Sequence, residues 1–287
     1  MNQKATGFDP ENYKSSTRDQ WNSSGAGYNA WGETLRKLIN PAGERMMEMA
    51  GIAAGSRVLE LAAGSGEQTI QLAGRVSPDG TVLATDLSPK ILAFAEENAR
   101  SAGLSNVEFR EMDGEQLDVP EGSYDAVVSS LGLMFFPNPQ KSVEAQRRAL
   151  KPGGRVAALV ISVPEKNPFF SVPAKVIRER VNLPPPQPGM PGPFALGAPG
   201  TIEELFSSAG LKDVSSETVS SLLELPSVAE HLRFLKDAFG ALHMMMAGLD
   251  ESGKQATWDA VGEALSPFEG AGGFRCPAEL IVCVGTG

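Results

Sequence analysis

Short apolar runs alternate with amphipathic segments between residues 57 and 163, and this alternation constrains the fold more than any other feature of the chain. Such runs, bounded by Gly, Pro or Asp, are typical of buried strands, and the segments between them have helical periodicity. The predicted strands are Arg57–Leu61, Thr81–Thr85, Val107–Glu111, Tyr124–Ser130 and Arg155–Val163, and the predicted helices are Glu67–Val76, Pro89–Ala102 and Gln140–Leu150. The pattern predicts an α/β fold with a doubly wound, largely parallel sheet whose ligand lies at the carboxyl ends of the strands.

The segments on either side of this region are less regular. Residues 1–20 are polar and are expected to be loose, whereas residues 21–50 show a helical pattern that Pro41 divides into two helices. The prolines between 164 and 200 exclude regular structure throughout that stretch. Further elements are expected at 172–180 (helix), 201–209 (helix capped by Thr201), 212–223 (strand), 228–246 and 251–265 (helices) and 279–284 (strand). We therefore expect an N-terminal helical segment or lid over 1–50 and a sheet domain over 51–287, with 164–200 and 227–265 as insertions.

The charge of the chain restricts the classes of partner. Its 287 residues include 25 Lys and Arg and 35 Asp and Glu, a formal net charge of −10, which argues against nucleic acid because phosphate contacts need clustered cations. Two cysteines, Cys276 and Cys283, make neither a disulfide framework nor a zinc site, so no metal is expected and a reducing cytoplasm fits best. The N-terminus does not resemble a signal peptide, and no apolar run is long enough to predict a membrane span. The sequence leaves the oligomeric state open.

Four features follow successive strands and should therefore meet at one edge of the sheet. The first is Glu60-Leu61-Ala62-Ala63-Gly64-Ser65-Gly66, whose glycines permit a sharp turn and a close approach to a ligand. The second is Asp86-Leu87, where the carboxylate can accept both ribose hydroxyls of an adenosine and the leucine can pack on adenine. The third is Met112-Asp113-Gly114, whose carboxylate can accept from the adenine amino group, and the fourth is Ser129-Ser130-Leu131.

Each feature also has an ordinary structural explanation. Gly64 and Gly66 suit any tight strand-to-helix turn, Asp86 lies near the start of the next helix, and Asp113-Gly114 is a common turn sequence. Their coincidence at successive strand ends favours a binding site. Thr69 stands where the dinucleotide fingerprint needs a third glycine, which favours an adenosine without a pyrophosphate over a nicotinamide or flavin cofactor.

The segments that carry these features resemble the motifs of a known family. VLELAAGSGEQT, VLATDLSPKILAFAEENA, VEFREMDGEQLDVPEGSYDAVVSS and ALKPGGRV are similar to the successive motifs of class I S-adenosylmethionine-dependent methyltransferases, and most similar to the branch with the ubiquinone and menaquinone C-methyltransferases. The resemblance covers residues 50–163. It implies S-adenosyl-L-methionine as cofactor and a Rossmann-like seven-stranded sheet with an antiparallel last strand, which makes 212–223 and 279–284 the sixth and seventh strands.

The resemblance also implies a role for several strand-end residues. Glu60, Ala62, Gly64 and Gly66 would contact the methionyl end, Asp86 would hold the ribose, and Asp113 would lie beside the adenine. The positions of the neighbouring residues at the same strand ends also predict cofactor contacts for Ser65, Leu87, Met112, Gly114, Ser129 and Leu131. The chain departs from many relatives in having Ala62-Ala63 in the first loop. It also lacks the His that others carry after the fourth strand, where this chain reads Gly132-Leu133-Met134-Phe135-Phe136.

The acceptor side is predicted from individual residues outside the similar segments, because the resemblance fades after residue 165. Trp21, Tyr28 and Trp31 either form a lid on the cofactor or acceptor or attach an N-terminal helix to the sheet, and the loop 184–199 is either a cover or a connector. Met134 and Met245 suit an adaptable apolar pocket. His243 is the candidate base, whereas an ordinary helix role for it and for His231, twelve residues earlier on one predicted helix, is favoured.

These features predict methyl transfer from S-adenosylmethionine to a small, fairly apolar acceptor at O, N or C. A non-catalytic module that binds S-adenosylmethionine is the alternative with the same fold. A nicotinamide-dependent oxidoreductase is the alternative from another class, and Thr69 argues against it.

Overall fold

A computed structural model describes residues 8–187 and 189–287, so the predictions for residues 1–7 and Pro188 lie outside the described residues. Its centre is one sheet in the order β3-β2-β1-β4-β5-β8-β6, with β7 paired only to β8. The strands are β1 (Arg57–Leu61), β2 (Thr81–Asp86), β3 (Val107–Glu111), β4 (Tyr124–Ser130), β5 (Leu150–Ile161), β6 (Lys212–Leu225), β7 (Glu269–Gly270) and β8 (Gly273–Thr286). β1 to β5 pair in parallel, and β8 runs antiparallel to both β5 and β6. The predicted α/β sheet with an antiparallel last strand is confirmed, and the short β7 is an addition to it.

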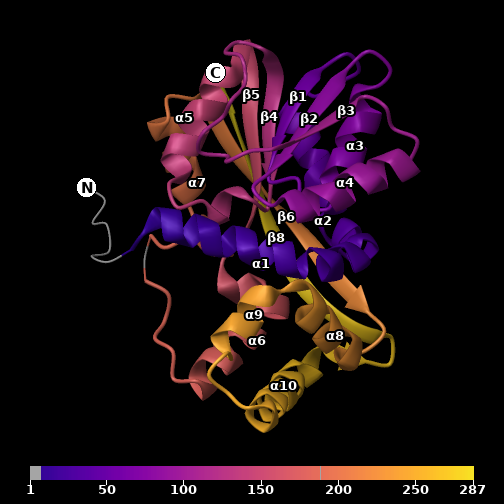
Figure 1. The fold of residues 1–287 in the computed structure, drawn as a ribbon, viewed down its shortest axis with the longest axis vertical. Coiled ribbons are helices and arrows are strands. Elements are labelled where there is room, and N and C mark those ends of the chain that lie inside the picture. Colours follow the sequence, from indigo (N-terminus) through magenta and orange to yellow (C-terminus); the bar gives the residue numbers. More distant parts are fainter. Residues whose placement is uncertain (1–7, 188) are drawn as a thin grey trace.

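Helices cover both faces of this sheet, which explains why its central strands are apolar on both sides. α2 (Gly32–Met49), α3 (Glu67–Val76) and α4 (Pro89–Ser101) pack in a row against one face. α5 (Pro139–Ala149) and α7 (Thr201–Ser208) contact each other and cover the other face, as Figure 1 shows. Val58, Leu59 and Leu61 of β1 are consequently fully buried.

The last two long strands extend beyond the rest of the sheet. β8 pairs with β5 only from Thr286 to Leu280, but it pairs with β6 as far as Phe274. This two-stranded extension carries a helical cap below the sheet in Figure 1. The cap consists of α6 (Pro168–Arg180), α8 (Val228–Ala238), α9 (Gly240–Met245) and α10 (Glu251–Leu265).

The N-terminal region departs most from the sequence prediction. Residues 10–20 are not loose, since α1 (Pro10–Ala30) begins there, with Asp9 accepting from the backbone N–H groups of Glu11 and Asn12. Pro41 does not separate two helices; it lies inside α2, and the break falls at Trp31. The free energy gained by burying the apolar side of α2 outweighs the cost of the backbone hydrogen bond that Pro41 removes. Figure 1 shows α1 crossing the molecule between the sheet and the cap.

Other element boundaries also differ from the prediction. β5 begins at Leu150 and passes through the Pro152-Gly153 stretch that was expected to precede it, with a shift of register against β4. The single helix predicted over 228–246 is two helices, α8 and α9, separated at Phe239. α7 begins after Gly200 in a left-handed conformation, so Thr201 is its first residue and not its N-cap. Among the residues that the structure describes, none of the helices is long and apolar enough to span a membrane.

Candidate active site

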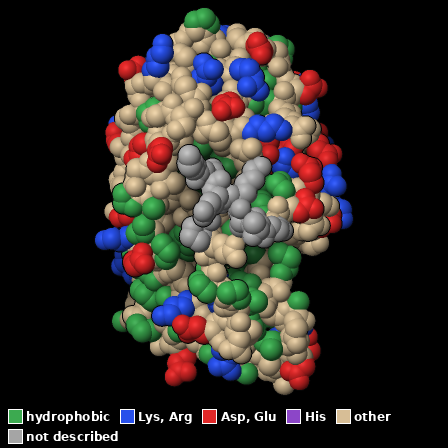
Figure 2. All heavy atoms as spheres, turned by 90° about the vertical axis from the view of Figure 1, so that its left-hand side faces the viewer, with side chains coloured by type: hydrophobic (Ala, Val, Ile, Leu, Met, Phe, Trp, Pro, Cys, Tyr) green, Lys and Arg blue, Asp and Glu red, His purple; other side chains and the backbone are tan. Residues whose placement is uncertain are grey.

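A cavity of about 460 Å³ lies at the carboxyl ends of the parallel strands, between the sheet, α1 and the helical cap. One half is lined by the loops that follow β1 to β4, and the other by apolar side chains of α2, α6, α8 and the 3₁₀ turn η1 (Leu133–Phe135). Figure 2 shows hydrophobic side chains gathered over the lower half of the face it presents, where the cap lies. The position agrees with the ligand site expected for a parallel sheet.

The loop between β1 and α3 has the backbone of a close-approach turn. Gly64 and Gly66 have positive φ angles of 59° and 92°, and a Cβ on Gly66 would come within 3.0 Å of Ala95. Ala62 also has a positive φ, 57°, a left-handed conformation that costs a non-glycine residue about 1 kcal/mol. Gly132 leaves room for it, since a Cβ there would lie 2.4 Å from the Ala62 Cβ. The strained alanine at the predicted methionyl contact is therefore built into the site.

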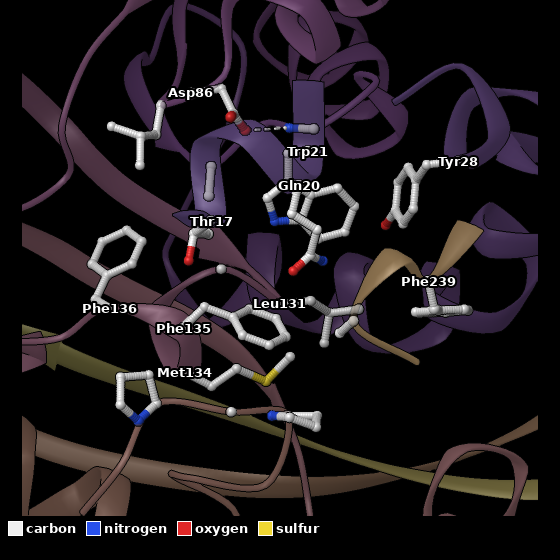
Figure 3. A pocket seen from close by; sticks show the side chains of 18 of the residues that line it. Thr17, Gln20, Trp21, Tyr28, Asp86, Leu131, Met134, Phe135, Phe136 and Phe239 are labelled. Atoms are coloured by element: carbon white, nitrogen blue, oxygen red, sulfur yellow. Dashed lines mark hydrogen bonds between the residues drawn. The ribbon is translucent and has the colours of Figure 1, made fainter. Parts of the chain in front are cut away.

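Asp86 is fixed by the backbone of two loops at the end of β2. Its Oδ2 accepts a hydrogen bond from the N–H of Gly64 at 3.0 Å, the dashed line in Figure 3, and its Oδ1 accepts from the N–H of Ser88 at 2.9 Å. Burial raises the pKa of Asp86 despite these bonds. The carboxylate thus lines the cavity at the place where the ribose was predicted.

Glu60 is a second buried carboxylate, with 1% of its surface exposed. Thr69 Oγ1 donates to its Oε2 at 2.6 Å, so the residue that breaks the dinucleotide fingerprint serves as the partner of this acid. Burial raises the pKa of Glu60 to about 8, an effect that Thr69 opposes and that Glu67 and Asp86 reinforce. In the described part of the chain no Lys or Arg forms an ion pair with Glu60 or Asp86.

Asp113 lies at the other end of the polar half and is paired with a lysine. Lys14 Nζ on α1 is 2.8 Å from Asp113 Oδ2 and 2.8 Å from Glu115 Oε2. Burial alone would raise the pKa of Asp113, but the bonds from Lys14 and from the N–H of Glu115 hold it below its ordinary value. The helix predicted as loose therefore contributes a charged residue to the site.

The residues of the polar half fit S-adenosylmethionine. A small recess of about 30 Å³ adjoins the main cavity and is lined by Glu60, Glu67, Gln68 and Ser130 among others. The side-chain amide of Gln68 and the Oγ atom of Ser130 are buried without a hydrogen-bond partner in the described residues, so they are suited to a polar ligand. The carboxyl groups of Glu60 and Glu67 in the recess have no cationic partner there and so favour the ammonium group of the methionyl part. Lys14 is the one cation that lines the main cavity among the described residues, and because it is already paired with Asp113 it offers little to a pyrophosphate.

The other half of the cavity is apolar and rich in aromatic rings. Met134 and Phe135 of η1 face Leu131 in Figure 3, with Phe239 on the far side. Thr17 and Gln20 of α1 are the polar side chains that point toward this space. The wall is completed by Leu35, Leu38, Ile39, Ile161, Phe169, Phe170, Phe234, Met244 and Leu280.

The structure brings most of the residues predicted for the site together. The cavity or its recess is lined by Glu60, Ala62, Gly64, Asp86, Leu87, Met112, Asp113 and Leu131, and on the acceptor and lid side by Trp21, Tyr28 and Met134. Four others, Ser65, Gly66, Gly114 and Ser129, lie behind this wall. Gly66 and Gly114 lack a side chain where a neighbouring residue packs closely. A Cβ on Gly114 would come 2.5 Å from the ring of Phe136. Ser65 donates to Glu67 at 2.6 Å.

Three residues that were predicted for the acceptor side or the lid, Trp31, His243 and Met245, do not line the cavity in the structure. Trp31 donates through Nε1 to Asp237 Oδ2 at 3.1 Å and so attaches the N-terminal helices to α8. Met245 is not part of the cavity wall, where its neighbour Met244 lies instead. His243 is exposed, its Nε2 lies 2.8 Å from the backbone oxygen of Lys236, and its ring packs against Trp258. Because the chain turns at Phe239, His231 lies on α8 and His243 on α9, and the two do not share one helix as predicted.

His231 is a buried structural residue behind the apolar wall. Its Nε2 lies 2.9 Å from the backbone oxygen of Phe169, and its ring stacks on Phe274 with centroids 4.6 Å apart. Burial lowers its pKa to about 4. It therefore supports the start of α6 and does not reach the cavity.

Lys14, Thr17, Gln20 and Gln68 were missed as site residues. The spacing of Tyr13, Thr17 and Gln20, at four and three residues, is a helical signal that could have placed them on one face. The buried amide of Gln68 left no signal in the sequence.

Comparisons with known proteins agree with this geometry. Residues 41–180 match the model of the ubiE/COQ5 methyltransferase family. The ubiquinone/menaquinone biosynthesis C-methyltransferase UbiE of Pseudomonas aeruginosa is 30% identical over 161 residues, which cover 55% of this chain and 63% of that protein. The chain thus spans less than two thirds of the length of this curated relative.

Solved structures extend the likeness of fold to most of the chain. The YcgJ protein of Bacillus subtilis has a TM-score of 0.57 at 18% identity, over 86% of this chain and 98% of that one. A phosphoethanolamine N-methyltransferase of Haemonchus contortus, in complex with phosphomonomethylethanolamine and S-adenosylhomocysteine, has a TM-score of 0.53 at 18% identity, over 86% of this chain and 52% of that one. The comparisons support S-adenosylmethionine as cofactor and confirm the predicted resemblance. Residues 41–180 thus match the ubiE/COQ5 methyltransferase family model, and the fold of the chain is similar to that of solved structures that include a methyltransferase.

Proposed function

We propose that this protein transfers a methyl group from S-adenosylmethionine to a small, fairly apolar acceptor. The observation that carries the proposal is one continuous cavity with a polar, acidic half at the strand ends and an aromatic half under the cap. The family match supports methyl transfer as the reaction, and the aromatic half supports the choice of acceptor. The predicted cytoplasmic location stays a prediction.

The polar half supplies binding and orientation for the cofactor. Asp86 would accept from the ribose hydroxyls, Asp113 would lie beside the adenine, and Glu60 with Gln68 and Ser130 would lie beside the methionyl part; all five line the cavity or its recess. When bound, S-adenosylmethionine supplies a methyl group on a positively charged sulfur, already activated for in-line displacement. The chain's contribution to the rate is then to align the two reactants and to keep water out.

The apolar half offers no base to the acceptor. Among the described residues that line it, none carries a carboxyl, imidazole or amino group, and both histidines lie elsewhere. Burial beside Glu67 and Asp86 raises the pKa of Tyr28 in the cavity wall, so its phenol stays protonated. We therefore propose an acceptor that already presents a reactive electron pair, such as an unprotonated amine, a thioether or an acidic enol or phenol. Thr17 and Gln20 can orient it by hydrogen bonds.

Calorimetric titration with S-adenosylmethionine and S-adenosylhomocysteine tests the cofactor half, and the absence of binding would refute the proposal. A radiolabelled methyl donor with a panel of small apolar amines, thioethers and acidic enols and phenols tests the acceptor half. Binding without turnover across the panel would favour the non-catalytic module instead. Nicotinamide absorbance in the purified protein would favour the oxidoreductase.

A further inference from the structure

Lys14 is a buried cation in α1, a helix most of whose residues are exposed or half-buried. Its residue surface is 8% exposed, and its Nζ lies between Asp113 Oδ2 and Glu115 Oε2, at 2.8 Å from each. Glu115 is itself 4% exposed. Removing one partner of a buried charge cluster leaves an unpaired buried charge, which is strongly unfavourable. The cluster therefore holds α1 against the loop that follows β3.

The same carboxylates connect α1 to the apolar wall of the cavity. Asp113 Oδ1 accepts from the N–H of Glu115 at 2.9 Å, and Glu115 Oε1 accepts from the N–H of Asn138 at 2.6 Å. Asn138 caps α5 and ends the loop that carries Met134 and Phe135. One lysine thus joins the lid helix, the predicted adenine-side acid and the loop that forms the acceptor wall.

The two halves of α1 are attached differently. In the C-terminal half, Asn22 accepts from Ser88 Oγ at 2.8 Å and Asn29 accepts from Asn98 at 2.7 Å. Gly27 lies so close to α8 that a Cβ there would be 2.0 Å from the backbone oxygen of Asp237. This half is fixed to both the sheet domain and the cap.

The N-terminal half of α1 depends on Lys14. Apart from this cluster, its ion pairs with other described elements amount to one long, exposed contact of 3.9 Å between Arg18 and Glu111. Its inward side chains, Tyr13, Thr17 and Gln20, line the cavity instead of packing into a core. This half therefore spans the cavity and is held at its far end by a polar contact.

We propose that Lys14 is a positioning residue that keeps the N-terminal half of α1 closed over the cofactor cavity, and that separation of Lys14 from Asp113 and Glu115 opens the path for cofactor exchange. The part that concerns exchange rests on the proposed function. Asp113 both pairs with Lys14 and lines the adenine side of the cavity. The position of α1 and the binding of the cofactor therefore depend on the same carboxylate. Lid segments of this kind are drawn from the parts of a fold with few apolar contacts.

Hydrogen exchange of the protein without cofactor tests the closure directly. We expect Lys14→Met to raise the exchange of residues 10–21 by about fivefold or more, with β1 and β4 unchanged. Lys14→Arg, which keeps the charge, should stay near the wild type. Lys37→Met is the matched control, because the Lys37 side chain is 73% exposed and its one ion pair within the described ranges is with Glu33 on its own helix. Unchanged exchange of 10–21 in Lys14→Met, or an equal rise in β1 and β4, would overturn the proposal.

Cofactor exchange gives the second readout. Dissociation of S-adenosylhomocysteine, followed in stopped flow by tryptophan fluorescence, should be about tenfold faster in Lys14→Met and unchanged in Lys37→Met. An unchanged rate overturns the role in exchange. If Lys14→Met does not fold, Glu115→Gln removes one charge and keeps an acceptor for Asn138, and the same local exchange is expected. If the wild type binds no S-adenosylhomocysteine, the proposed function fails, while the exchange experiment still decides the role of Lys14.

Discussion

Cofactor binding should release a proton from Glu60. This carboxyl is buried, has one hydrogen bond from Thr69, and has a pKa raised to about 8. At pH 7 only about a tenth of it is ionised in the empty protein, and ionising it costs about 1.4 kcal/mol. The ammonium of S-adenosylmethionine on the methionyl side would hold it ionised. We therefore expect about 0.9 proton to leave per cofactor bound at pH 7.

The direction of the pH dependence follows from that release. Between pH 7 and pH 6 the ionised fraction falls about tenfold, so the dissociation constant for S-adenosylmethionine should rise about tenfold. Calorimetry at pH 7 in phosphate and in imidazole measures the proton from the dependence of enthalpy on buffer ionisation. Glu60→Gln should bind more weakly, with no buffer dependence and little pH dependence. A wild-type slope near zero, or an equal slope in Glu60→Gln, would refute the reasoning.

The empty protein gives an independent check of the same pKa. Its folded state binds this proton more tightly than the unfolded chain between pH 4.5 and about 8. Glu60 therefore contributes less to stability as pH rises through that window. We expect Glu60→Gln to melt above the wild type at pH 8 and near it at pH 5, as measured by circular dichroism.

Three further predictions concern the rest of the site and its supports. Asp86→Ala should weaken S-adenosylmethionine binding by about tenfold or more in calorimetry, because the N–H of Gly64 also loses its acceptor; unchanged affinity would mean that the ribose lies elsewhere. His231 is neutral in the fold with a pKa near 4, so acid should destabilise the protein as pH falls from 6.5 toward 4, by about 3 kcal/mol in total, and a melting series should show a smaller loss in His231→Gln. Gly27→Ala should lower the melting temperature through its 2.0 Å clash with Asp237, whereas Gly74→Ala, in a helix with open space, should raise it slightly; equal effects would contradict the tight contact between α1 and α8.

The polar half of the cavity was predictable because its signals are local. Glycine turns, strand-end acids and apolar runs are written within a few residues of one another, and β1 matched its predicted limits. Lys14 was not predictable, since its partner Asp113 is 99 residues away and α1 has few apolar residues to mark it. The predicted helix break at Pro41 was wrong for the opposite reason. Proline disfavours a helix locally, but the packing of the buried side of α2 outweighs that preference. The acceptor wall combines α2, η1, α6 and α8, which no single stretch of sequence brings together.

The charges around the cavity bear on whether the methyl donor or its demethylated product binds more tightly. Asp86, Asp113 and Glu115 line it with Lys14 as their one cation among the described residues, and Glu60 and Glu67 line the adjoining recess. Loss of the methyl group converts a positively charged sulfur into a neutral thioether. The acidic lining therefore favours the methyl donor over its product by charge alone, and the low polarity of the apolar half strengthens that preference. Under the proposed role of Lys14, product release would depend less on charge than on α1, whose opening the contact of Lys14 with Asp113 and Glu115 would control.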